Sequence, residues 1–181
     1  MLIKNTSEHY GSLTKILHSI ILSIIIALLI LGHIMGYFSD SLRLNLYNTH
    51  KAFGILVLFL GIIFVLWSSQ NIKPAYPETL KPWEKLAAHG VRYALYVAMI
   101  AMPLFGWCFS TAYGKTTSFF GLFTLAAPVP VDLRWAGFFA SAHKCTGWII
   151  VALVLLHTVA ALKHHIIDRN NVLERMFNFK K

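Results

Sequence analysis

The sequence predicts an all-α membrane protein, a single domain (1–181) built as a four-helix transmembrane bundle. Of its 181 residues, 57% are hydrophobic and only 13% are charged, and the mean hydropathy is +0.63. Soluble domains of this size usually carry about 25% charged residues. Long apolar runs alternate with short basic segments along the whole chain. Lipid, rather than water, is therefore expected to surround most of the molecule.

Four runs free of Asp, Glu, Lys and Arg cover residues 16–39, 52–72, 93–114 and 145–162. A helix of about 20 mostly apolar residues crosses the hydrocarbon core of a bilayer. We predict helices over about 12–37, 47–69, 84–110 and 137–166. The first run exceeds the apolar region of a signal peptide, about 7–15 residues, and no small-residue cleavage site follows it. It is expected to be retained as a helix.

The connection 116–131 is also uncharged but is interrupted by glycine and proline. It carries Gly121, Pro128 and Pro130, together with Phe119, Phe120 and Phe123. Irregular backbone is not tolerated in contact with the lipid core. We expect an interfacial loop lying over the mouth of the bundle.

The formal net charge is +9, but the basic residues flank the apolar runs. This placement indicates contact with anionic lipid and excludes nucleic acid as the partner. Eleven Lys and Arg residues fall on the side that holds both chain ends. The other side holds five: Arg43, Lys51, Lys115, Arg134 and Lys144. Because short cytoplasmic segments are richer in Lys and Arg, both termini are expected to be cytoplasmic.

Two cysteines, Cys108 and Cys145, lie in or near apolar segments, and no CxxC pair exists. The absence of a paired motif argues against a zinc or thioredoxin-like site. Buried cysteines usually behave as small hydrophobic residues. A disulfide between the two is left open, because both should lie toward one membrane face.

Two of the nine histidines, His143 and His157, share one face of the fourth predicted helix. Their 14-residue spacing corresponds to about 21 Å and nearly four turns. Ionisable residues inside a membrane span are rare and usually functional. Because neutral imidazole is a common axial ligand of haem iron, this face predicts two stacked haems, one near each membrane surface.

Each haem iron needs a second ligand at the same depth from another helix. His18 begins the first helix at the cytoplasmic side, so its depth matches that of His157. His50 begins the second helix at the opposite side, so its depth matches that of His143. The sequence therefore predicts an inner bis-histidine site and an outer one in the bundle core, where bundles build cofactor sites.

Two other histidines, His33 and His89, are alternatives by depth alone. His33 follows His18 by 15 residues and so lies about 60° away from its face. Each can instead be a polar side chain bonded to a helix carbonyl or placed at a haem edge. The headgroup level suits His9, His164 and His165, whereas the histidine of VALVLLHTVAAL lies deep in an apolar run.

Several segments resemble the prokaryotic cytochrome b561 family, over nearly the whole chain. They are His18, NTHKAFGIL, AHGVRYALYVAMIAMPLFGW, SAHKCTGWIIVALVLLHTVAALKHH and the tail DRNNVLERMF. The resemblance implies four helices in the bacterial inner membrane and two haem b groups. It also implies that His18, His50, His143 and His157 are the iron ligands. Ser19 departs from the family, which often has tryptophan there, and this affects the packing beside the inner haem.

One branch of this family is similar to an oxidoreductase that oxidises superoxide and passes the electrons to ubiquinone. The resemblance implies the same activity here, with no residue assigned a catalytic role. The first alternative is a cytochrome b membrane subunit that passes electrons from a periplasmic dehydrogenase or hydrogenase to quinone. A second, from another class, is a histidine-based metal or proton transporter, which would be colourless.

Candidate substrate sites lie at the two ends of the predicted bundle. Superoxide is an anion, and Lys51, Lys144 and Arg134 form a basic outer mouth that can attract it. The same side chains can instead pair with haem propionates or remain solvated. His164 follows His157 by two turns on the same face and can donate a hydrogen bond to a quinone oxygen. The alternative for His164 is an interfacial histidine.

Overall fold

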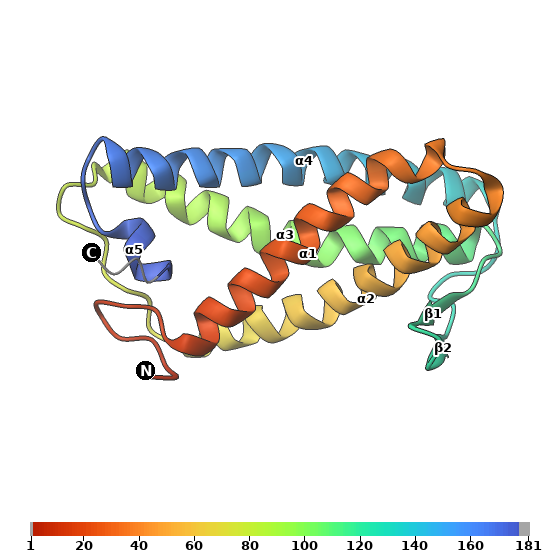
Figure 1. The fold of residues 1–181 in the computed structure, drawn as a ribbon, viewed down its shortest axis with the longest axis horizontal. Coiled ribbons are helices and arrows are strands. Elements are labelled where there is room, and N and C mark those ends of the chain that lie inside the picture. The colour runs from red at the N-terminus through yellow and green to blue at the C-terminus, as the bar shows by residue number, and fades with distance from the viewer. Residues whose placement is uncertain (1, 178–181) are drawn as a thin grey trace.

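The computed structural model describes residues 2–177, and its long helices run antiparallel as a bundle (Figure 1). In chain order the elements are α1 (Ser12–Ile34), the 3-10 helix η1 (Met35–Tyr37), α2 (Asp40–Gln70), α3 (Pro82–Ala112), β1 (Thr117–Phe119), β2 (Phe123–Leu125), α4 (Leu133–Ile166) and α5 (Val172–Met176). Within the described residues, four helices are long and apolar enough to cross a membrane. The predicted all-α, four-helix class of membrane protein is confirmed.

Both chain termini lie at one end of the bundle, called here the terminal end (Figure 1). The two short strands lie near the other end, called here the hairpin end (Figure 1). α1 and α3 run from the terminal end to the hairpin end, and α2 and α4 run back. Because neighbouring helices run in opposite directions, the start of one helix lies at the same depth as the end of the next.

Helix α2 begins at Asp40, seven residues before the expected start at 47. Its first turn carries an ion pair between Arg43 and Asp40. At 31 residues, α2 spans about 46 Å, well beyond the roughly 30 Å hydrocarbon core. The polar first turns therefore extend outside the apolar run from which the helix was predicted.

Side-chain contacts to backbone amides set the starts of α3 and α4. α4 begins at Leu133, four residues earlier than expected, because the carboxylate of Asp132 accepts a hydrogen bond from Arg134 N at 2.8 Å. α3 begins with Pro82, and Glu84 Oε2 accepts a hydrogen bond from Lys81 N at 2.9 Å. Such caps satisfy amides that have no partner within the helix.

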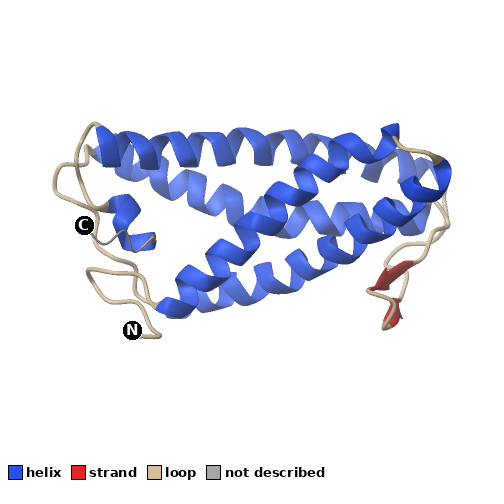
Figure 2. Cartoon of the chain, viewed as in Figure 1, coloured by secondary structure: helices blue, strands red, loops and turns tan. Residues whose placement is uncertain are grey.

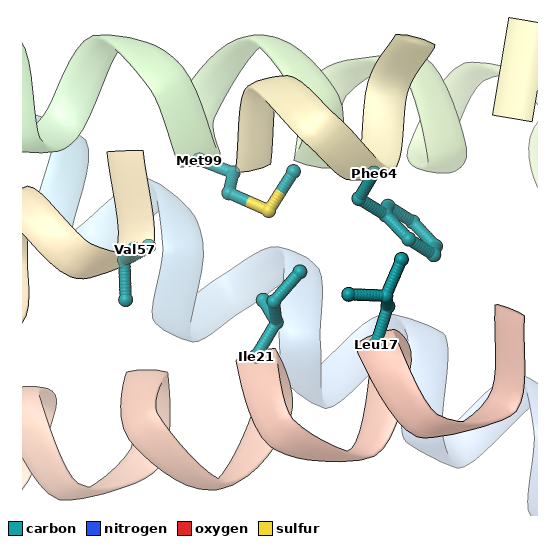
Figure 3. Packing of buried hydrophobic residues seen from close by; sticks show 5 residues of the cluster. All are labelled: Leu17, Ile21, Val57, Phe64 and Met99. Carbon is teal, nitrogen blue, oxygen red and sulfur yellow. The ribbon is translucent and has the colours of Figure 1, made fainter. Parts of the chain in front are cut away.

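A small apolar cluster joins α1, α2 and α3 toward the terminal half of the bundle (Figure 3). Its buried members are Leu17, Ile21, Val57, Phe64 and Met99. The side chain of Met99 lies against Gly61, where an added Cβ would be 3.2 Å from Met99 Cγ. α3 packs most extensively on α4, so these two helices form one layer and α1 and α2 form the other. The cluster connects the two layers through Met99 of α3.

The segment 116–131, expected to be irregular, contains the antiparallel hairpin of β1 and β2 (Figure 2). Leu122 N donates to Phe119 O across the turn, and Phe120 and Gly121 take left-handed φ values of 52° and 78°. The ring of Phe119 contacts Phe59 of α2, with centroids 6.0 Å apart. The hairpin therefore packs along the flank of α2, because its uncharged aromatic side chains gain contact there.

The N-terminal segment folds back on the terminal end through Asn5. Asn5 Oδ1 accepts hydrogen bonds from Gly11 N at 2.9 Å and Thr14 Oγ1 at 2.7 Å. Its amide nitrogen donates to Ile72 O at 2.9 Å. A Cβ on Gly11 would lie 2.2 Å from Ile3 O, so only glycine allows this close approach.

Candidate functional site

The structure brings the four predicted ligand histidines together as two pairs, one toward each end of the bundle. His18 of α1 faces His157 of α4, with ring centroids 6.4 Å apart. His50 of α2 faces His143 of α4, with centroids 6.1 Å apart. These are the pairs expected from depth along the helices.

The centroid separations suit a metal ion held between two imidazoles. A zinc–imidazole bond is about 2.0–2.1 Å and the ring nitrogen lies about 1.2 Å from its centroid, so two rings on one ion have centroids about 6.4 Å apart. Both pairs fall within a few tenths of an ångström of this value. The separation in each pair is therefore compatible with one metal ion lying between the two rings.

The ring nitrogens in these pairs have the chemistry that a bound metal requires. His143 Nδ1 lies 2.9 Å from Met102 O, and because a carbonyl only accepts, Nδ1 donates and Nε2 stays free. Among the described residues, His18 Nδ1 and His50 Nδ1 are buried without a hydrogen-bond partner. A buried polar atom without a partner costs about 1–3 kcal/mol. These rings are therefore placed for a group other than protein.

An apolar cleft surrounds the pair at the hairpin end. It is lined by His50, His143, Gly54, Met102 and Pro103, and by the aliphatic side chains Ile25, Leu28, Leu29, Val57 and Ile150, together with Met99. Apolar walls with two facing imidazoles fit a flat, largely apolar macrocycle ligated on both faces.

Two glycines that the sequence reasoning missed make room for these rings. A Cβ on Gly106 would lie 2.9 Å from His143 Cε1 and 3.0 Å from its Nδ1. A Cβ on Gly32 would lie 3.3 Å from His50 Cε1. Each glycine lies on a helix that neighbours the helix of its histidine. A glycine inside a predicted helix, at the same depth as a predicted ligand histidine, was the sequence feature that could have indicated these two positions.

The structure gives His33 and His89 other neighbours. His33 Nδ1 donates to Leu29 O at 2.7 Å, and its ring packs edge-on against Trp148 at 5.1 Å. The ring of His89 lies 5.3 Å from that of Tyr76 and is stacked at 6.5 Å on Tyr93. Among the described residues, none of these three ring contacts pairs His33 or His89 with another histidine.

Phe177, the residue directly after α5, lies beside the terminal-end pair. The ring of Phe177 packs edge-on against His18, with centroids 6.1 Å apart. An aromatic side chain from the C-terminal segment thus lies beside the histidine that precedes Ser19. Phe177 is 159 positions from His18 in sequence, so the residues around Ser19 give no indication of this contact.

His164 is buried at the terminal end of α4 and forms part of a charged cluster. Its Nδ1 lies 2.6 Å from Asp168 Oδ2, which also accepts from Lys163 Nζ at 2.7 Å. Lys163 Nζ also donates to Glu84 Oε1 of α3 at 2.6 Å. The hydrogen bond from Lys163 holds the pKa of the Asp168 carboxyl below its ordinary value. His164 is thus anchored on one nitrogen.

The three basic residues expected at the outer mouth all lie at the hairpin end, but in different settings. Lys51 Nζ donates to Thr116 O at 2.7 Å, next to the hairpin. Arg134 pairs with Asp132 at 3.1 Å, and this hydrogen-bonded guanidinium holds the pKa of the Asp132 carboxyl below its ordinary value. Lys144 is exposed directly after His143. Two of the three charges are therefore tied to loops.

Both cysteines are free thiols in this structure. Cys108 is partly buried on α3, and Cys145 is exposed on α4. The disulfide left open by the sequence is not formed. Neither thiol is among the residues that line the histidine cleft.

Comparison with known proteins relates the chain to a cytochrome family. The family model described as prokaryotic cytochrome b561 matches residues 9–179. Cytochrome b561 homolog 2 of Escherichia coli K12 is 33% identical over 178 residues, covering 97% of this chain and 95% of that protein. Cytochrome b561 homolog 1 of the same organism is 28% identical over 148 residues, covering 81% and 84%.

Proposed function

Because this chain belongs to the prokaryotic cytochrome b561 family, a family of multi-pass membrane electron carriers with b-type haem, we propose that it carries electrons from superoxide to ubiquinone. The observation that supports this most strongly is the pairing of histidines at two depths of α4. Their 14-residue spacing separates the two pairs by about 21 Å along the helix. Two redox centres at these depths would connect the two faces of a membrane.

We assign His18 and His157 to the inner haem b iron, and His50 and His143 to the outer one. When bound, each haem b would be held by one pair of these histidines and would supply a one-electron iron couple. The protein orients the ligands: Met102 O fixes the ring of His143, and Gly106 leaves space for it. The cleft at the outer site is lined mainly by apolar side chains.

The proposed direction of transfer follows from the distribution of basic residues. The terminal end carries most of the Lys and Arg residues, so it is assigned to the cytoplasmic face of the bacterial inner membrane. The hairpin end then faces the periplasm. Electrons would enter at the outer pair and leave at the inner pair.

Superoxide oxidation is assigned to the hairpin end. Lys144 is exposed one residue after His143 and can attract an anion, with Lys51 and Arg134 adding to the local positive field. We also assign Lys51, whose Nζ donates to Thr116 O, as a candidate partner of a haem propionate. Raising the ionic strength should slow the reaction if the positive field matters.

Ubiquinone reduction is assigned to the terminal end, where His164 lies about 10 Å beyond His157 on the same face of α4. Two superoxide anions would lose one electron each and become oxygen. One quinone would take these two electrons and two cytoplasmic protons to become quinol. Electrons and protons balance without any further reactant.

The test is a purified preparation in detergent, examined first by visible spectroscopy and by the ratio of haem to protein. We expect two haems per chain, and superoxide-driven reduction of a soluble ubiquinone analogue. Alanine at His18 or His157 should remove one haem, and alanine at His50 or His143 should remove the other. A colourless preparation from haem-replete cells would reject the assignment and favour a transporter.

A dehydrogenase or hydrogenase that co-purifies with the chain would favour the membrane-subunit alternative. In that case the pure chain should contain both haems but fail to reduce quinone with superoxide. Adding the partner and its substrate should then restore quinone reduction. The same preparation therefore separates the two electron-transfer functions.

A further inference from the structure

One oxygen of Asp168 holds the buried imidazole of His164 at the terminal end of the bundle. Asp168 Oδ2 lies 2.6 Å from His164 Nδ1 and 2.7 Å from Lys163 Nζ, so two donors fix the position of this carboxylate. Asp168 belongs to the turn after α4, and the side chain of His164 is only 11% exposed. His164 is thus oriented by a residue that is itself held in place.

Glu84, His164 and Asp168 have ligand atoms close enough together to suggest a metal site. The ammonium of Lys163 already lies between the two carboxylates, 2.6 Å from Glu84 Oε1 and 2.7 Å from Asp168 Oδ2. Among the described residues, the charged groups beside His164 are Glu84 of α3, Lys163 of α4 and Asp168 of the turn after α4. The cluster is better explained as a support for the imidazole than as a cation site.

We propose that Asp168 is a positioning residue that holds His164 for proton delivery to the quinone, an inference that rests on the proposed function. A carboxylate only accepts hydrogen bonds, so His164 Nδ1 carries the hydrogen and Nε2 is left for the quinone oxygen. Carboxylates orient catalytic imidazoles in this way in other enzymes. His164 is the group that contacts the substrate, and Asp168 acts through it.

The proton balance follows from this arrangement. Protonated His164 gives the hydrogen on Nε2 to a quinone oxygen, so an N–H bond breaks and an O–H bond forms. The ring is left neutral with its hydrogen on Nδ1, which is the tautomer that Asp168 binds. Cytoplasmic water then returns a proton to Nε2, and a second transfer completes the quinol. The two electrons come from two superoxide anions.

A double-mutant cycle tests whether Asp168 acts through His164. The chain with both haems is measured as Asp168→Ala, as His164→Ala and as the double variant, with superoxide and a soluble ubiquinone analogue. Supporting groups behind a functional imidazole are worth about 10–100-fold. We expect Asp168→Ala to lower kcat by about this factor with KM changed less than about threefold. In the His164→Ala background, Asp168→Ala should lower kcat by less than about twofold, because the two substitutions do not act independently.

Two further variants separate positioning from a structural effect. Asp168→Asn keeps an acceptor oxygen for both donors and should recover most of the rate. Asp168→Leu fills the space without an acceptor and replaces Asp168→Ala if the latter loses haem. Glu78→Gln removes an exposed negative charge from the 71–81 loop on the same side and should keep the parent kcat.

The dissociation constant of the quinone analogue, from quenching of tryptophan fluorescence, provides a measurement independent of turnover. For Asp168→Ala it should change by less than about threefold, in line with the expected KM, because Asp168 acts on proton delivery through His164 and not on binding. If Asp168→Ala lowers kcat equally with and without His164, or does not lower kcat at all, the positioning role is overturned while the proposed function stays intact. A parent chain with both haems that neither binds nor reduces the analogue would overturn both.

Discussion

Replacing Gly106 by alanine should displace the proposed outer haem while leaving the proposed inner haem in place. The added Cβ would lie 2.9 Å from His143 Cε1, whereas non-bonded carbon atoms sit about 3.5–4.0 Å apart, so the ring has to move by at least about 0.5 Å. Metal–ligand distances tolerate only about 0.2 Å. The movement also breaks or stretches the bond from His143 Nδ1 to Met102 O, worth about 1 kcal/mol.

The effect on folding should be smaller than the effect on haem content. Alanine is favoured over glycine in a helix by about 1 kcal/mol, and overpacking typically costs about 1–3 kcal/mol. These terms partly cancel, so the chain should still fold. The assay is the haem-to-protein ratio with the reduced visible spectrum, and the expected ratio falls from two toward one.

Gly90→Ala is the matched control on the same helix, because nothing lies within 4 Å of its added Cβ. It should keep two haems and raise the melting temperature slightly through helix propensity. Two haems and an unchanged spectrum in Gly106→Ala would refute the reasoning, since they would mean that the His143 ring is not confined as the structure indicates.

Asn5→Ala removes three hydrogen bonds at the terminal end and should lower stability by about 1–3 kcal/mol, measured as a lower melting temperature; an unchanged value would argue against this clasp. His33→Phe should retain two haems by the same pigment assay, because His33 is bonded to Leu29 O and packed on Trp148, and loss of a haem would instead make it a ligand. Lys144→Gln should slow superoxide oxidation at low salt, with less effect at high salt, and an equal effect at both would contradict steering. The pKa of Asp168 is lowered by Lys163, so its charged form stabilises the fold above about pH 3.9, the ordinary aspartate value, and this contribution is lost as pH falls through the lowered value. Melting temperatures measured from about pH 5 down to pH 3 should therefore fall less steeply for Asp168→Asn than for the parent, and parallel curves would show that this ion pair contributes little.

Sequence alone was sufficient for the four spans and for the pairing of histidines by depth. In lipid, a spanning segment has to satisfy its own backbone hydrogen bonds and so becomes a helix. The rise per residue is then constant, and position in the run converts directly into depth. This is why His18 could be matched with His157, and His50 with His143, before any tertiary contact was known.

Other features depended on how the helices rotate and approach one another, which residue spacing does not specify. The fit of Gly106 against His143, the contact of Phe177 with His18 and the packing of the hairpin on α2 all join segments distant in sequence. The burial of His164 likewise required the turn after α4 to bring Asp168 back onto the helix. Backbone hydrogen bonding determines depth along each helix, whereas side-chain packing between helices decides which groups meet at that depth.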